Sequence, residues 1–107
     1  MKTRIMYIER KAESLTGDAR IGKVTFSKSG KSIYYNGKHF HRFSGFKANY
    51  YESETGEEYW ISGCRKDGAD RLYGERLPIE IDNDIQEEYW ISIRNLPQCK
   101  YISVING

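Results

Sequence analysis

The dipeptide Asn36-Gly37 constrains the fold more than any other feature, because it separates two short runs of strand-forming residues. A two-residue type I′ turn needs positive φ at both central positions, and Asn followed by Gly adopts it readily. Such a turn pairs Tyr35 with Lys38 and Tyr34 with His39 across two antiparallel strands. The sequence therefore predicts a β-hairpin whose register is set by this turn.

Parity then assigns the side chains of this hairpin to two faces. The face predicted to be buried is apolar and carries Ile33, Tyr35 and Phe40. The opposite face is aromatic and partly polar, and it carries Tyr34, His39, His41 and Phe43. This second face is a candidate contact surface.

A second hairpin is predicted for residues 46–52 and 57–63, around the turn Ser53-Glu54-Thr55-Gly56. A four-residue loop there pairs Tyr50 with Tyr59 and Ala48 with Ile61, so these residues would form a buried face together with Phe46. Cross-strand aromatic pairs of this kind add about 0.2–1 kcal/mol each. The opposite face would carry Lys47, Asn49, Tyr51, Glu58 and Trp60.

The remaining strands are less strongly marked. Thr3 to Arg10 has apolar residues at both parities, which indicates a strand covered on both faces or one inside a barrel. Arg20 to Lys28 alternates apolar and polar residues. Shorter strands are predicted at residues 77–81 and 101–105, and loops at residues 12–19 and 64–74.

One helix is predicted, over about residues 83–96, with Asn83 or Asp84 as its cap and Pro97 after its end. Its apolar residues recur at helical spacing and are Ile85, Tyr89, Ile93 and Leu96, with Trp90 beside them. The hexapeptide Glu-Glu-Tyr-Trp-Ile-Ser occurs at residues 57–62 and again at 87–92. Context predicts a strand for the first copy and a helix for the second.

These elements predict one α+β domain over residues 1–107, since two domains would leave each half too short to bury a core. The expected architecture is a curved, mostly antiparallel sheet or small barrel of five to six strands, with the helix against it. The longest apolar run, Ile5 to Ile8, is far short of the roughly 18 residues of a membrane span. Without a secretory segment, a cytoplasmic location is expected.

Charge is distributed unevenly along the chain. Residues 1–50 hold 11 Lys/Arg and 3 Asp/Glu, a net +8, whereas residues 51–107 hold 6 and 12, a net −6. One interpretation is that the two halves attract each other across the fold. The other is a basic surface for an anionic partner and an acidic surface for a cationic one.

Most of the chain resembles a family of small bacterial proteins of unknown function, through residues 1–40 and 45–74. The strongest matches are the words YIERKAESLTGDARIG, YYNGK and TGEEYWISG. Members sometimes carry the label 1-deoxy-D-xylulose-5-phosphate synthase, which is a mislabelling because that thiamine-diphosphate enzyme is several times longer. The resemblance implies a standalone bacterial cytoplasmic domain and supplies no catalytic residue.

The sequence predicts no enzyme, no cofactor and no metal site. His39 and His41 share one strand face, but a metal site needs a third ligand, and Cys64, Glu58 and Asp67 are only loose candidates. Two cysteines, Cys64 and Cys99, make no disulfide framework and are expected to be free thiols. Phosphate-binding glycine loops and metalloprotease motifs are absent from the sequence.

The predicted function is therefore non-enzymatic binding of another protein, of the immunity type that neutralises a toxin. The alternative is a nucleic-acid-binding β-domain that uses the basic, aromatic hairpin face. No membrane partner is predicted, and the oligomeric state stays open. The candidate partner-binding residues are Tyr34, His39, His41, Lys47, Tyr51, Trp60, Arg65, Lys66 and Asp67.

Overall fold

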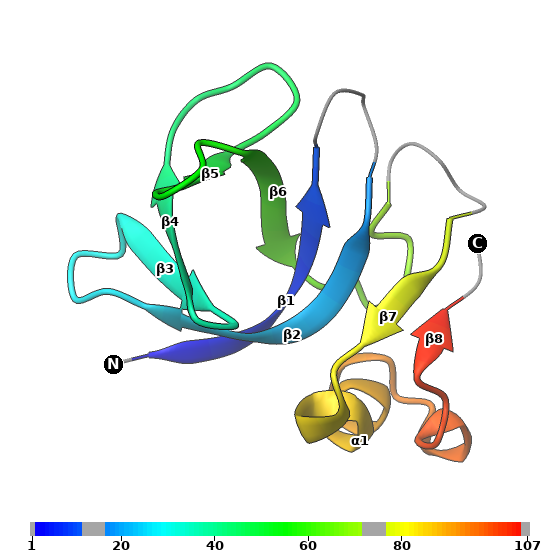
Figure 1. Ribbon diagram of the computed structural model, residues 1–107. Coiled ribbons are helices and arrows are strands. Elements are labelled where there is room, and N and C mark those ends of the chain that lie inside the picture. The colour runs from blue at the N-terminus through cyan, green and yellow to red at the C-terminus, as the bar shows by residue number, and fades with distance from the viewer. Residues whose placement is uncertain (1, 12–16, 72–76, 106–107) are drawn as a thin grey trace.

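In the computed structural model, which describes residues 2–11, 17–71 and 77–105, eight strands form one sheet, and six of them close into an antiparallel barrel (Figure 1). In the barrel each strand pairs with the next along the chain, and the sixth returns to the first, so no barrel strand is left with an open edge along its whole length. The barrel strands are β1 (Thr3–Arg10), β2 (Ala19–Phe26), β3 (Ser32–Tyr35), β4 (Lys38–Arg42), β5 (Tyr50–Glu52) and β6 (Glu58–Gly63). The predicted α+β class is confirmed in outline, and of the two predicted alternatives, a curved sheet or a small barrel, the structure has the barrel.

Strand β1 is covered on both faces, as its sequence predicted. Met6 and Ile8 point into the barrel and belong to its inner core. Tyr7, between them, is fully buried on the outside of the barrel in a second hydrophobic cluster. The barrel wall formed by β1 and β2 therefore separates two cores.

The outer core is covered by the C-terminal part of the chain (Figure 1). Strand β7 (Ile79–Ile81) pairs in parallel with β2, and β8 (Val104–Ile105) pairs antiparallel with β7. Helical turns follow β7 as η1 (Asn83–Ile85), α1 (Gln86–Glu88) and the wider π-turn η2 (Tyr89–Ile93), and η3 (Pro97–Cys99) comes later. Among the described residues this makes two strands more than the five to six predicted.

The helix is shorter than predicted. Helical turns end at Ile93 rather than at residue 96, because Asn95 adopts a left-handed conformation with φ of 53° that reverses the chain. The predicted caps were also wrong, since Asp82 occupies the N-cap position. The Asp82 side chain makes no capping hydrogen bond because Arg20 and Tyr35 bind its carboxylate. The apolar stripe is confirmed, with Ile85, Tyr89 and Trp90 buried against the barrel wall.

The first hairpin has the predicted register, with Tyr34 opposite His39 and Tyr35 opposite Lys38. Asn36 and Gly37 both have positive φ, at 52° and 76°, as the turn requires. The two copies of the repeated hexapeptide also differ as predicted, since the first lies in β6 and the second in helical turns. Turn geometry and context, which are local, were enough to determine these features.

The second hairpin is only partly as predicted. Tyr50 does pair with Tyr59, but β5 begins at Tyr50 and Phe46 is 99% exposed instead of buried. The reason is Asn49, whose side-chain amide exchanges two hydrogen bonds of 2.8 Å with the backbone of Ile61. This side chain takes the ladder position expected for Ala48, so the preceding residues leave the sheet as a loop.

At the C-terminus the predicted strand over residues 101–105 is reduced to β8, and Tyr101 is 82% exposed. The strand predicted at residues 77–81 is present as β7, but it begins only at Ile79, after Pro78. Of the predicted loops, residues 12–16 and 72–74 lie outside the described residues, and Ala19 belongs to β2 instead of the loop.

Candidate binding surfaces

An aromatic face covers the outside of strands β3, β4 and β5 and consists of Tyr34, His39, His41, Tyr51 and Phe43. The Tyr34 ring stacks on His39 with centroids 4.6 Å apart, and His39 meets His41 edge-on at 4.3 Å. His41 and Phe43 lie 5.4 and 5.6 Å from the Tyr51 ring. These contacts make one continuous ladder of rings, of which Tyr34 and Tyr51 are 43% and 36% exposed.

Positive charge predominates around this aromatic face, with Glu58, which lies opposite Tyr51 in the sheet, as an exception. From Ala19 to Tyr51 the sequence has seven Lys/Arg and no Asp/Glu. Because this stretch forms β2, β3, β4 and all of β5 except Glu52, and these strands are neighbours in the barrel, the cations are gathered on one half of it. An anionic partner is favoured at this surface.

A basic hollow of about 290 Å³ lies where the β2–β3 turn meets the start of β1. It is lined by Lys2, Arg4, Phe26, Ser27, Lys28, Ser29 and Gly30. The Ser27 hydroxyl accepts a hydrogen bond from the backbone N–H of Ser32, and Ser32 lies opposite His41 in the sheet. Three cations, two hydroxyls and no carboxylate line this hollow, which is the chemistry of an oxyanion site.

The nine residues predicted to contact a partner do not form one surface. Four of them, Tyr34, His39, His41 and Tyr51, lie together on the aromatic face. Trp60 instead packs, partly buried, against the outer core. Lys47 is half-buried in the β4–β5 loop. Arg65, Lys66 and Asp67 lie in the exposed loop after β6, where Arg65 and Asp67 pair with each other at 3.1 Å.

Phe46 is a surface residue that sequence reasoning misplaced. It stands at the tip of the β4–β5 loop, 99% exposed, between Gly45 and Lys47. The loop is anchored by hydrogen bonds from Gly45 to Ala48 and from Phe43 to Asn49. The alternation of the segment gave no sign that the strand would end before this residue.

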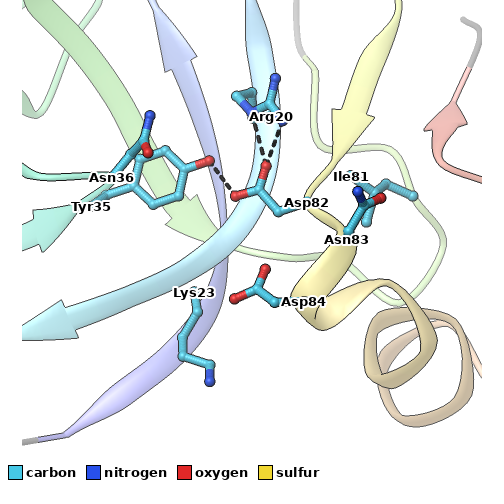
Figure 2. A pocket seen from close by; sticks show the side chains of 8 residues that line it. All are labelled: Arg20, Lys23, Tyr35, Asn36, Ile81, Asp82, Asn83 and Asp84. Atoms are coloured by element: carbon cyan, nitrogen blue, oxygen red, sulfur yellow. Dashed lines mark hydrogen bonds and ion pairs between the residues drawn. The ribbon is translucent and has the colours of Figure 1, made fainter.

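A second hollow, of about 490 Å³, opens between the barrel and the corner that follows β7 (Figure 2). At its base the Asp82 carboxylate accepts hydrogen bonds from Arg20 Nε at 2.9 Å and from Tyr35 Oη at 2.5 Å. Burial and the Asp82 hydrogen bond both raise the pKa of Tyr35, so Tyr35 remains the neutral donor. The hydrogen bond that the Arg20 guanidinium donates to Asp82 likewise raises the pKa of Arg20.

Sequence reasoning missed this second hollow. Arg20 and Asp82 are 62 residues apart, and no motif links them. The one available signal was Gly22, a glycine inside a strand, which often marks a close approach. A Cβ added at Gly22 would lie 2.4 Å from Asp82 Oδ2 and 2.5 Å from the Tyr35 ring, so only glycine leaves room for this pair.

Cys64, a candidate ligand in the sequence, is half-buried in the structure. Burial raises the pKa of the Cys64 thiol to about 12, which disfavours the nucleophilic thiolate. Among the described residues, the Cys64 thiol donates one long hydrogen bond, to the Ile5 carbonyl 3.8 Å away. Across the described ranges, no three His, Cys, Asp or Glu side chains come close enough to share a metal ion.

Many acidic side chains are engaged within the molecule. Glu57 pairs with Arg10 at 2.8 Å, and Asp82 and Glu80 both bind Arg20. Glu52 accepts hydrogen bonds from the backbone N–H groups of residues 54 and 55. These contacts support the interpretation that the two oppositely charged halves of the chain attract each other across the fold.

The fold and its surfaces thus define a small six-strand meander barrel with an attached C-terminal layer, two polar hollows and an aromatic outer face. Comparison of this chain with family models, with curated proteins and with solved structures found no match. None of the helical turns in the described part of the chain has the length and apolar character needed to span a bilayer.

Proposed function

We propose that this protein is a non-enzymatic binding domain whose aromatic face holds single-stranded nucleic acid. The observation that carries the proposal is the continuous ring ladder from Tyr34 to Tyr51, formed by a stretch of chain, residues 19–51, that holds seven Lys/Arg and no Asp/Glu. Stacking rings combined with cations is how proteins hold single strands without reading sequence. The proposal favours the second of the two functions predicted from sequence.

In this arrangement, bases stack on the two most exposed rings, Tyr34 and Tyr51. A backbone phosphate enters the basic hollow, where Lys2, Arg4 and Lys28 supply positive charge. Ser27, which lines the hollow, accepts a hydrogen bond from Ser32, and Ser32 lies opposite His41 of the ladder, so we expect one nucleic-acid strand to reach both. The two free cysteines, Cys64 and Cys99, support a reducing, cytoplasmic setting for this binding.

The test is fluorescence anisotropy with a labelled oligothymidylate, at low and at physiological salt. Base–aromatic stacking contributes about 1–3 kcal/mol per base, so Tyr34→Ala and Tyr51→Ala are each expected to weaken binding roughly 5- to 150-fold. Tyr101→Ala is the matched control, because Tyr101 is 82% exposed but lies on the C-terminal layer. Affinity should fall steeply with rising salt.

Two results contradict the proposal. One is the absence of binding at low salt. The other is binding that weakens equally in the Tyr51→Ala and Tyr101→Ala variants, which would mean that the aromatic face takes no part.

A protein partner, such as a toxin neutralised by an immunity-type protein, is the second candidate. Phe46 supports it, because a fully exposed aromatic side chain on an anchored loop suits insertion into a partner's pocket. The test is co-expression with the product of each neighbouring gene, followed by size-exclusion chromatography. A 1:1 complex that is lost in Phe46→Ala supports this candidate, and the absence of any complex removes it.

A further inference from the structure

The hollow of about 490 Å³ exists because strand β2 has two different neighbours along one edge. Strand β7 pairs with β2 as far as Ile21, and β3 pairs with it only from Thr25 onward. Residues 22–24 between them have no partner strand on this edge in the described structure. The hollow opens over that gap, at the place where the barrel and the C-terminal layer separate (Figure 2).

The gap leaves backbone hydrogen-bonding groups available. The Ile21 carbonyl accepts a hydrogen bond from Asp82 N–H on this edge. Alternate residues of a strand present their backbone groups to the same edge, so Lys23 presents its N–H and C=O here as well. A ligand in the hollow therefore meets a donor and an acceptor of the kind that normally pair with another peptide unit.

The walls of the hollow carry opposite charges. Arg20 and Lys23 come from β2, and Asp82 and Asp84 come from the corner after β7 (Figure 2). Arg20 and Asp82 satisfy each other, at 2.7 Å. Lys23 and Asp84 form no ion pair with any described residue, which leaves one cation and one anion for a ligand. Two side-chain amides, of Asn36 and Asn83, complete the polar lining.

The base of the hollow is built before any ligand arrives. Asp82 is held from two sides, by the Arg20 guanidinium and by the neutral Tyr35 hydroxyl. Gly22 has no side chain that would displace them. A prepositioned lining reduces the entropy lost on binding.

We propose that this hollow binds a small zwitterion of the α-amino-acid type. The ligand's carboxylate pairs with Lys23 and its ammonium group pairs with Asp84, while Asn36, Asn83 and the free strand edge take its remaining polar groups. A simple anion would leave Asp84 unpaired and a simple cation would leave Lys23 unpaired. The volume lies in the range of small-molecule sites, about 300–1,000 Å³. The site is separate from the aromatic face and does not depend on it.

The test is titration of the ¹⁵N-labelled protein, followed by ¹H–¹⁵N correlation spectra. The standard amino acids are added singly, and acetate and methylammonium serve as probes that carry one charge each. We expect saturable shifts of the Lys23, Asn36 and Asn83 amides with at least one amino acid, and no saturable shift with either single-charge probe.

Substitutions then locate the site. Lys23→Gln and Asp84→Asn each remove one charge-assisted contact, so each should raise the dissociation constant at least about tenfold. Glu87→Gln is the matched control, because Glu87 is an exposed acid of the same segment that does not line the hollow. The inference is overturned if no amino acid gives saturable shifts, if acetate or methylammonium shifts the same amides equally, or if Asp84→Asn binds as tightly as Glu87→Gln.

Discussion

Glu9, in strand β1, is a buried acidic residue that is only 1% exposed. It accepts a hydrogen bond from the Tyr7 hydroxyl at 2.6 Å and pairs with Lys11 at 2.9 Å and with Arg71 at 3.6 Å. The side chains of both cations are almost as deeply buried, at 6% and 4% exposed. Glu9→Gln removes the negative charge and keeps the shape, so the substitution isolates the electrostatic part of this cluster.

The expected loss is large because the substitution removes the negative charge of a desolvated carboxylate that two buried cations contact. Breaking a buried pair in this way costs about 3–5 kcal/mol of unfolding free energy. Domains of this size have about 5–15 kcal/mol in total. The matched control is Glu57→Gln, which breaks the Arg10–Glu57 pair, whose side chains are 40% and 37% exposed. Solvent-screened pairs of that kind contribute about 0.2–1 kcal/mol.

Urea denaturation followed by tryptophan fluorescence measures both variants against the unmodified chain. The Glu9→Gln midpoint should fall severalfold further than the Glu57→Gln midpoint, with an unchanged slope against urea. If Glu9→Gln destabilises the protein no more than Glu57→Gln does, the negative charge of Glu9 does not stabilise the buried cluster.

Two further predictions concern titratable groups. In a Cys99→Ser background, Cys64 should react slowly with Ellman's reagent at pH 8 in the native protein and quickly in urea, because its native pKa of about 12 keeps it a thiol; equally fast reaction in both conditions would contradict the burial argument. For Glu52, hydrogen bonds from the Thr55 and Glu54 backbone lower the pKa, so its stabilising effect is complete above the ordinary glutamate pKa and is lost as pH falls through the lower folded pKa. The difference in unfolding free energy between the unmodified chain and Glu52→Gln should therefore shrink between pH 6 and pH 3, and a difference that stays constant over this range would contradict the argument.

Much of the barrel was predictable because its signals are local. The Asn36-Gly37 turn set the register of β3 and β4, and apolar residues at both parities marked β1 as covered on two sides. The predictions were wrong where a contact with a residue distant in the sequence outweighed a local conformational preference. Asn49 took a ladder position against Ile61 and left Phe46 in solvent. The helix cap was predicted at Asn83 or Asp84, but Asp82 occupies the N-cap position and its carboxylate binds Arg20.

The same distinction, between local signals and contacts of residues distant in the sequence, applies to the candidate sites. The aromatic face could be listed from sequence, since strand parity places Tyr34, His39 and His41 on one side. Sequence could not show that Trp60 belongs to the outer core, because either face of β6 can be covered once a C-terminal layer packs on the barrel. The Arg20–Tyr35–Asp82 cluster was invisible for a related reason, since it joins three segments that no pattern links.

By itself the sequence determined the hairpin registers near the turns, the alternation of buried and exposed side chains and the segregation of charge along the chain, because each depends on residues close together in sequence. Only the tertiary structure decided that the strands close into a barrel and that β2 pairs with β7 along one part of its edge and with β3 along another. It also decided that a polar hollow opens between these two pairings. These outcomes depend on which distant surfaces pack together, and packing is a property of the whole chain rather than of any segment.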